Sequence, residues 1–252
     1  MLIKFYCEFI MQLSVIIPAY NEEKRLPNSL ERMLNYLEAH FANQYELIIV
    51  NDGSTDGTIG VVEEFSARFP NRIRLISYTP NRGRGVAVRR GVTEATGEYV
   101  LETDADGSVD DEAIVRFFNT LHTGAVDALM GSRNAPGAKI LTHQSWVRVC
   151  LGNMFLWLAR IVFGFPSTDY ALGFKMFTRA AAQDIFTHQY DDHFLAEAEV
   201  YYVAKRRGWR TQELPVYWTD FRDSKVHPFR DSIRSLSGLG KIFMRNKRRG
   251  YE

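Results

Sequence analysis

The strongest constraint on the fold is a regular alternation of short apolar runs with amphipathic segments between residues 13 and 131. Short, mostly apolar runs, typical of strands in the interior of a sheet, occur at 13–17, 46–50, 73–76, 98–101 and 126–130. Apolar residues at helical spacing occupy the stretches between them, at 26–41, 61–69, 85–94 and 114–121. Because strands that alternate with helices pair in parallel, the pattern predicts an α/β fold with a mostly parallel central sheet flanked by helices.

Polar clusters follow three of the expected strands. Tyr-Asn-Glu at 20–22 follows the first strand, Asp-Gly-Ser at 52–54 follows the second, and Asp-Ala-Asp at 104–106 follows the fourth. Ligands of parallel sheets bind beyond the carboxyl ends of the strands. We therefore expect the three clusters to converge on one cleft.

Two of these clusters carry carboxylates with a chemical interpretation. Asp104 and Asp106 are separated by one small residue, so both can offer oxygen ligands to a divalent ion beside a substrate phosphate. Mg²⁺ suits this layout because it takes one or two protein carboxylates together with phosphate oxygens and water. Asp52 leaves two interpretations open: an Asx-turn residue, or a carboxylate that accepts a hydrogen bond from a nucleobase N–H.

Composition and missing motifs exclude several functions. The formal net charge of +1 over 252 residues gives no basic field of the kind that nucleic-acid binders carry, so no nucleic-acid partner is expected. The two cysteines, Cys7 and Cys150, have no metal-binding spacing and indicate a reducing compartment. Gly83-Arg84-Gly85 does not open the first strand–helix unit, and there is no Walker lysine motif, which argues against dinucleotide and P-loop enzymes.

The second half of the chain has a different rhythm. A polar loop at 132–143 precedes an apolar segment at 146–165, a strand at 174–177, a helix at 194–206 and a strand at 211–218. We expect an extension of the same domain that supplies the pocket of a second substrate. The segment at 146–165 has the length of a membrane span, but it contains Arg148 and Arg160. Since central arginines are costly in hydrocarbon, it is predicted to be a buried or interfacial helix.

The two ends of the chain are apolar or amphipathic. Residues 1–11 lack the features of a signal peptide and are too short to span a bilayer. They are interpreted as an extra strand, a surface-lying segment, or a stretch before a functional start at Met11. Residues 228–246 form a basic amphipathic pattern that suits an anionic membrane surface. The alternative is a surface helix that packs its apolar face on the domain.

The motifs at 15–22, 50–58, 81–85 and 104–107 resemble, in this order, those of the family 2 glycosyltransferases of GT-A fold, which is Rossmann-like. Farther along, residues 169–179 and 224–226 resemble the polyprenyl-phosphate sugar transferases. The string Gly-Phe-Lys-Met-Phe-Thr-Arg-Ala-Ala from residue 173 is most similar to the dolichyl-phosphate glucose synthase branch. The resemblance implies a single GT-A domain over 1–252, with a nucleotide-sugar-binding half at 13–131 and an acceptor half at 132–225.

The resemblance also implies roles for individual residues. Asp104 and Asp106 would bind Mg²⁺ or Mn²⁺ and the diphosphate. The nucleotide sugar would be held by Pro18, Ala19, Tyr20, Glu22, Asp52, Gly53, Arg84 and Ala105. The sugar and the acceptor phosphate would be contacted by Arg133 and Arg148, with a catalytic role, and by Arg222, Ser224 and Lys225. Three carboxylates have two possible roles, a contact with a sugar hydroxyl or a structural role: Asp169, Glu197 and Glu199.

The function implied is a metal-dependent, inverting hexosyltransferase that moves glucose from UDP-glucose, or mannose from GDP-mannose, to dolichyl or undecaprenyl phosphate. A lipid phosphate has its second pKa near ~6, so it is largely dianionic at neutral pH and needs no strong general base. We expect a peripheral protein on the cytoplasmic face of a membrane. Two alternatives are a family 2 transferase with a hydroxyl acceptor and a nucleotide-sugar-binding protein without turnover. The oligomeric state is left open.

Overall fold

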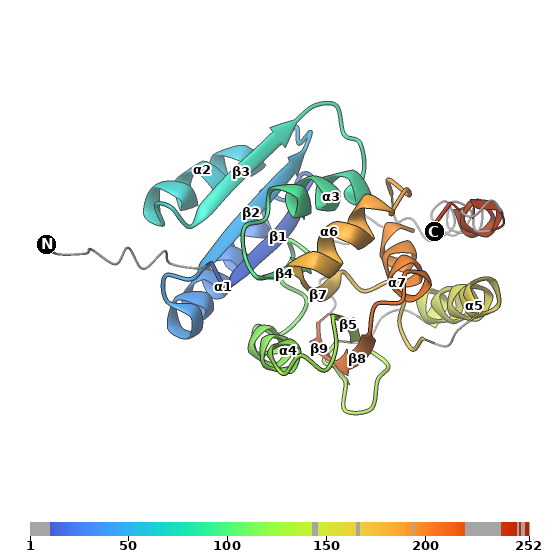
Figure 1. The fold of residues 1–252 in the computed structure, drawn as a ribbon. Coiled ribbons are helices and arrows are strands. Elements are labelled where there is room, and N and C mark those ends of the chain that lie inside the picture. The colour runs from blue at the N-terminus through green and yellow to red at the C-terminus, as the bar shows by residue number, and fades with distance from the viewer. Residues whose placement is uncertain are drawn as a thin grey trace, which may run out of the picture.

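The computed structural model describes residues 11–142, 146–164, 167–193, 195–219, 238–245, 247 and 250–251, without the side chains of 146–149 and 151. A seven-stranded sheet has the strand order β3-β2-β1-β4-β7-β5-β8 (Figure 1). Its strands are β1 (Leu13–Ala19), β2 (Tyr45–Asp52), β3 (Ile73–Tyr78), β4 (Tyr99–Thr103), β5 (Ala128–Ser132), β7 (Phe174–Thr178) and β8 (Thr211–Pro215). The predicted α/β fold with a mostly parallel sheet is confirmed.

Seven helices with assigned bounds surround the sheet in the described part of the chain. They are α1 (Leu26–Phe41), α2 (Thr58–Arg68), α3 (Arg84–Glu94), α4 (Glu112–His122), α5 (Trp146–Phe163), α6 (Arg179–Thr187) and α7 (Ala196–Arg206). Helix α6 was not expected from the sequence. It begins directly after β7, where the Thr178 side chain accepts a hydrogen bond from the Ala181 N–H and caps the helix.

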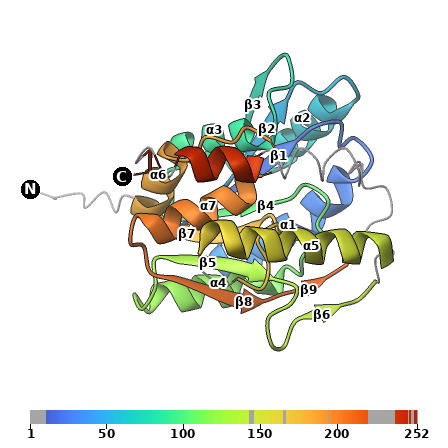
Figure 2. The same ribbon diagram turned by 90° about the vertical axis from the view of Figure 1, so that its right-hand side faces the viewer.

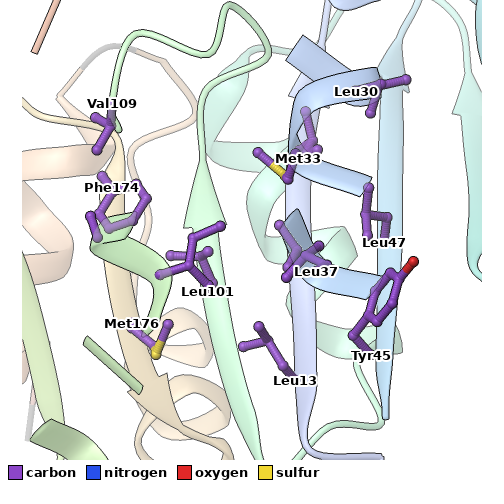
Figure 3. Close-up of a cluster of buried hydrophobic side chains, with 14 of the residues drawn as sticks. Leu13, Leu30, Met33, Leu37, Tyr45, Leu47, Leu101, Val109, Phe174 and Met176 are labelled. Atoms are coloured by element: carbon purple, nitrogen blue, oxygen red, sulfur yellow. The ribbon is translucent and has the colours of Figure 1, made fainter. Parts of the chain in front are cut away.

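The core consists of two apolar layers, one on each face of the sheet. Val15 and Ile17 of β1 pack toward α1, α2 and α4, whereas Ile16 packs toward α3, α6 and α7, as the alternation of side chains along a strand requires. Figure 3 shows the first layer, in which Leu37 of α1 points toward the strand residue Leu101. Burial on both faces explains why the strands have mostly apolar sequences.

Strand β7 runs antiparallel between β4 and β5, which are otherwise parallel members of the sheet. Phe174, the first residue of β7, pairs with Thr103, the last residue of β4. The segment that leads into β7, residues 169–173, therefore reaches the same edge of the sheet as Asp104. This pairing brings the two halves of the chain together at one edge.

The expected strand at 211–218 is two strands in two sheets. Pro215 ends β8, and β9 (Tyr217–Trp218) pairs with β6 (Lys139–Ile140) in a separate two-stranded sheet. The predicted polar loop at 132–143 thus contains a short strand. Periodicity cannot reveal this exchange, because the partner residues lie far apart in the sequence.

Helix α5 is covered on one side only (Figure 2). Ala159 and Phe163 are buried, whereas Trp157 and Ile161 are 60% and 61% exposed. Arg160 turns back to donate two hydrogen bonds to the Ser167 carbonyl, at 2.8 and 3.1 Å. Among the residues that the structure describes, no helix combines the length and apolar character needed to cross a bilayer.

The predicted amphipathic helix at 228–246 is described only from residue 238, and residues 238–245 are helical. Leu239 and Ile242 are buried in the second core layer, while Phe243 is 42% exposed. For residues 238–245, the structure therefore favours a surface helix that packs its apolar face on the domain over a helix that lies on the membrane. Residues 228–237 and the predicted N-terminal interpretations at 1–10 lie outside the described residues.

Candidate active site

Two of the three polar clusters are joined by hydrogen bonds. The Asn21 N–H donates to Ser54 Oγ at 2.9 Å, and the Glu22 N–H donates to Thr58 Oγ1 at 2.8 Å. These bonds connect the segment after β1 with the turn after β2, as their parallel pairing allows. Asn21 has a φ of 55°, a left-handed conformation that asparagine tolerates better than most residues.

Asp52 is buried and holds a neighbouring loop. Its carboxylate accepts hydrogen bonds from the Arg82 N–H at 2.7 Å, the Gly83 N–H at 2.8 Å and Asn81 Nδ2 at 2.8 Å. The side chain that bonds within this turn is that of Asn51, whose Oδ1 accepts from the Ser54 N–H, three residues on, at 3.1 Å. The Asx-turn interpretation of Asp52 is therefore wrong, and its contact with a nucleobase stays a prediction.

The loop held by Asp52 leads directly into Arg84, the first residue of α3. Its guanidinium donates to Asp104 Oδ1 from Nη2 at 2.8 Å and from Nε at 3.1 Å. Gly83 has a φ of 104°, which only glycine adopts readily, and this turn delivers Arg84 to the sheet edge. Arg84 thus lies beside Asp104, and its predicted contact with the nucleotide sugar stays a prediction.

Asp106 lies in a less hydrated environment than an ordinary surface aspartate. Burial, followed by the neighbouring charge of Asp104, raises the pKa of Asp106. The Ser108 N–H donates to its Oδ1 at 3.0 Å, and Arg25 Nη1 lies 3.6 Å from its Oδ2. A carboxylate whose charge is only partly compensated favours an added cation.

The donor set fits Mg²⁺ or Mn²⁺. In the described chain no three His, Cys, Asp or Glu side chains gather in a metal-binding group, and two carboxylates that leave positions for phosphate and water match the habit of Mg²⁺. A Cβ at Gly173 would lie 2.6 Å from Asp104 Oδ1, so glycine there keeps space beside the carboxylate. Asp104 and Asp106 are the residues that would hold the ion.

On the acceptor side, Arg133 follows β5 and forms a two-pronged pair with Asp169. Nε lies 2.7 Å from Oδ2 and Nη2 lies 2.9 Å from Oδ1, while the guanidinium stacks 5.3 Å from the centre of the Trp218 ring. Burial disfavours the charged form of Asp169, but the charge and hydrogen bonds of Arg133 outweigh it and hold the pKa of Asp169 below its usual value. Asp169 thus orients Arg133, and its contact with a sugar hydroxyl stays a prediction.

Glu213 supports this pair and was not found by sequence analysis. From β8 its carboxylate accepts the Thr168 N–H at 3.1 Å and the Ser167 hydroxyl at 2.5 Å. Thr168 in turn hydrogen-bonds Ser132 Oγ at 2.6 Å, next to Arg133. A glutamate alone in a strand carries no local signal for this role, because its partners are about 45 residues away.

Lys175, also missed, lies at the centre of a buried ionic group. Its Nζ donates to the Leu172 carbonyl at 2.7 Å, pairs with Glu197 and lies 3.5 Å from Glu102 Oε1. Burial lowers the pKa of Lys175, and the charge of Glu102 opposes that shift. The sequence did carry a signal for this role, because Lys175 lies between apolar neighbours in a strand. A lysine is rarely buried in a sheet unless it is paired, so this position predicts a buried acidic partner.

Glu197 and Glu199 have different surroundings. Glu197 pairs with Arg84 and with Lys175, so it belongs to the site cluster. Glu199 is fully buried and accepts the N–H groups of Tyr190 and Asp191, at 2.9 and 2.5 Å. These bonds favour the structural interpretation of Glu199.

The structure describes five further predicted residues. Pro18 and Ala19 end β1, Gly53 and Ala105 lie in the loops after β2 and β4, and Tyr20 is 41% exposed. The side chain of Arg148 and all of Arg222, Ser224 and Lys225 lie outside the described residues. Their roles, and the domain boundaries drawn from the resemblance, stay predictions.

A hollow of about 580 Å³ lies beside the Asp-x-Asp loop, next to α1. Its lining includes Arg32, which pairs with Asp111 at 2.5 Å and donates to the Gly107 carbonyl at 2.9 Å. Neither Arg84 nor Asp104 lines this hollow, so it is separate from the cluster around those two residues.

Sequence comparison agrees with this geometry. The family model described as glycosyl transferase family 2 matches residues 14–186. The chain belongs to glycosyl transferase family 2. It is 34% identical to the dolichyl-phosphate beta-glucosyltransferase of Homo sapiens over 86% of this chain and 70% of that protein. It is 32% identical to the Saccharomyces cerevisiae protein of the same name, over 92% and 74%.

Solved structures confirm the GT-A fold of this family 2 transferase. Glucosyl-3-phosphoglycerate synthase from Mycobacterium tuberculosis, in complex with UDP, has a TM-score of 0.65 at 17% identity, over 91% of this chain and 80% of that one. TarS of S. aureus with UDP-GlcNAc has a TM-score of 0.62 at 21% identity, over 94% and 67%. At these identities the likeness concerns the fold alone.

Proposed function

We propose that this family 2 transferase moves glucose from UDP-glucose to a polyprenyl phosphate such as dolichyl phosphate, with inversion at the anomeric carbon. The relatives at 32–35% identity carry the name dolichyl-phosphate beta-glucosyltransferase, which supports glucose and dolichyl phosphate. The observation that carries the choice of acceptor is the Arg133–Asp169 pair. Asp169 has a lowered pKa and is bound at both oxygens by Arg133, so it is a poor base for a sugar hydroxyl. A phosphate dianion needs no such base.

In this mechanism an acceptor phosphate oxygen forms a bond to the anomeric carbon while the bond from that carbon to the leaving diphosphate breaks. Attack from the opposite face converts an α-linked donor into a β-linked product. Asp104 and Asp106 would hold a Mg²⁺ or Mn²⁺ ion, which would supply Lewis-acid stabilisation of the leaving diphosphate. Arg133, held by Asp169 and Trp218, orients the acceptor phosphate with two parallel N–H donors, as guanidinium groups do.

We also propose that the protein works at the cytoplasmic surface of a membrane, where its lipid acceptor resides. Met154, Trp157 and Ile161 are exposed along one side of α5. Phe243 and Met244 are exposed on the 238–245 helix, which lies on the same face of the molecule (Figures 1 and 2). Apolar groups gathered on one face fit an interfacial contact with lipid.

The test is an assay of purified protein with Mn²⁺ and radiolabelled UDP-glucose or GDP-mannose, with and without dolichyl or undecaprenyl phosphate. Label from UDP-glucose that enters the organic phase only when the lipid phosphate is present supports the proposal. Label from GDP-mannose instead would make mannose the sugar. Slow hydrolysis of a donor without lipid labelling would favour a hydroxyl acceptor, and donor binding without any turnover would favour a nucleotide-sugar-binding protein.

A further inference from the structure

Arg84 has more acidic partners than a single guanidinium needs. Two of its nitrogens donate to one oxygen of Asp104, and Nη1 lies 3.3 Å from Glu102 Oε1 and pairs with Glu197. Asp104 is also one of the two carboxylates that would hold a divalent cation. A guanidinium and a metal ion carry charges of the same sign and repel each other, so a cation at Asp104 Oδ1 weakens the two hydrogen bonds that Arg84 donates to that oxygen.

The groups behind Arg84 are buried and mutually paired. Glu102 and Lys175 face each other across the β4–β7 pairing, and Glu197 reaches them from the first turn of α7. Their exposed fractions are 1%, 1% and 4%. Glu102 Oε2 is buried and has no hydrogen-bond partner among the residues that the structure describes. This unused acceptor gives Arg84 a second position close to its present one.

We infer that Glu102, Lys175 and Glu197 form a buried ionic frame that holds Arg84 as a built-in competitor of the divalent cation for Asp104. The inference rests on the proposed function, because the cation is the one that the donor diphosphate requires. When the cation binds Asp104, Arg84 loses its hydrogen bonds to that carboxylate but keeps its pairs with Glu102 and Glu197. The nitrogens that it no longer shares with Asp104 can then donate to the diphosphate. Metal binding and the presentation of Arg84 to the diphosphate are then one coupled event.

The frame explains how such an exchange avoids leaving a buried charge unpaired. Removing one partner from a buried ion pair is strongly destabilising, because the remaining charge is uncompensated. Arg84 has two further carboxylates, so it loses Asp104 without losing all pairing. Once Asp104 is taken by the cation, two cations, Arg84 and Lys175, face two carboxylates, Glu102 and Glu197, so the charges that remain in the frame balance.

The first experiment titrates Mn²⁺ alone into the full chain and follows free Mn²⁺ by electron paramagnetic resonance. Arg84→Gln should bind Mn²⁺ about fivefold or more tightly than the wild type, the lower end of typical coupling between sites. The same variant should bind UDP or GDP more weakly at saturating Mn²⁺, because the arginine that meets the diphosphate is gone. Mn²⁺ affinity that is unchanged or reduced in Arg84→Gln would overturn the inference.

A matched control separates competition from a general loss of positive charge. Arg89 lies on the same helix and pairs with Gln189 and Asp192. Arg89→Gln should leave Mn²⁺ affinity within about twofold of the wild type. An equal increase in both variants would point to bulk charge and contradict direct competition. Should Arg84→Gln not fold, Arg84→Lys keeps the charge but cannot contact Asp104 and Glu197 together, and it too should bind Mn²⁺ more tightly.

A double-mutant cycle tests the frame itself, with Glu197 as the positioning residue. Glu197→Gln should weaken Mn²⁺ binding in the wild-type background, because Arg84 then relies more on Asp104. In the Arg84→Gln background the same change should have an effect of no more than about twofold. Equal effects in both backgrounds would show that Glu197 does not act through Arg84. The Mn²⁺ titrations need no nucleotide sugar, so their result is independent of the transfer assay. Failure of the inference about Arg84 can therefore be distinguished from failure of the proposed function.

Discussion

Asp52 and Arg133, one site residue in each half of the chain, are held by different kinds of contact. In the first half, Asp52 is fixed by backbone N–H groups of the next loop, which belong to Arg82 and Gly83. In the second half of the chain, Arg133 is fixed by the side chain of Asp169, across 36 residues of sequence. Backbone contacts follow from the fold itself, whereas side-chain contacts depend on which residues occupy a few distant positions.

This difference suggests a division of labour. A loop held through its backbone keeps its shape whatever side chains it carries, which suits a nucleotide and diphosphate common to many transferases. A side chain held by another side chain can be changed by one substitution, which suits an acceptor that differs between enzymes. Changes in the first half should therefore affect every reaction, and changes in the second should alter the acceptor step.

The largest effect is expected for Asp104→Asn in the first half. Loss of the charged ligand should reduce transfer by at least about 10³-fold, since a metal ion supplies several kcal/mol of transition-state stabilisation. Radiolabel transfer and Mn²⁺-dependent nucleotide binding should fall together. If transfer falls while nucleotide binding with Mn²⁺ is retained, Asp104 acts on the chemistry without holding the metal.

Arg133→Lys in the second half should lower kcat/KM for polyprenyl phosphate by about 10²-fold, the size expected when one charged donor to the reacting group is lost. Lysine keeps the charge but cannot pair with both oxygens of Asp169 and the acceptor at once. Nucleotide binding measured by calorimetry should be unchanged. Equal losses of donor and acceptor binding would break the proposed division between the halves.

The Arg133–Asp169 pair should also give pH-dependent stability. Since Arg133 lowers the pKa of Asp169 in the folded state, the pair stabilises the fold above the unfolded pKa of about 3.9. That stabilisation, about 2 kcal/mol for a hydrogen bond to a charged group, is lost as pH falls through the folded pKa. Urea unfolding of wild type and Asp169→Asn should differ by a constant amount near neutral pH and converge in acid. A difference independent of pH would contradict this account.

The smallest effect is expected at the exposed side of α5. Trp157→Ser with Ile161→Ser should weaken sedimentation with anionic vesicles by about tenfold or more, because each apolar side chain contributes about 1.5–3 kcal/mol when buried. Hydrolysis of the donor in the absence of lipid should not change. Vesicle binding equal to that of the wild type would show that the membrane contact does not involve this side of α5. The matched control is Asn119→Ser on α4, which replaces an exposed neutral side chain on a helix that packs against the opposite face of the sheet from α5.

The elements of the first half could be predicted from the sequence because their signals are local. The helix predicted at 26–41 has those same bounds as α1, and the clusters after β1 and β2 meet as expected. In the second half, the antiparallel insertion of β7 and the division of 211–218 between two sheets could not be predicted. Both depend on pairing between distant strands, and no periodicity encodes which strand a given run will join.

The sequence by itself determined the α/β class, the family and the carboxylates at the strand ends, because apolar periodicity and short motifs act over a few residues. Only the tertiary structure decided what those carboxylates and arginines contact. Arg84 meets Glu197 more than a hundred residues away because β7 pairs with β4 and α7 packs beside α3. Partners of that kind are chosen by strand order and register, which are properties of the whole sheet.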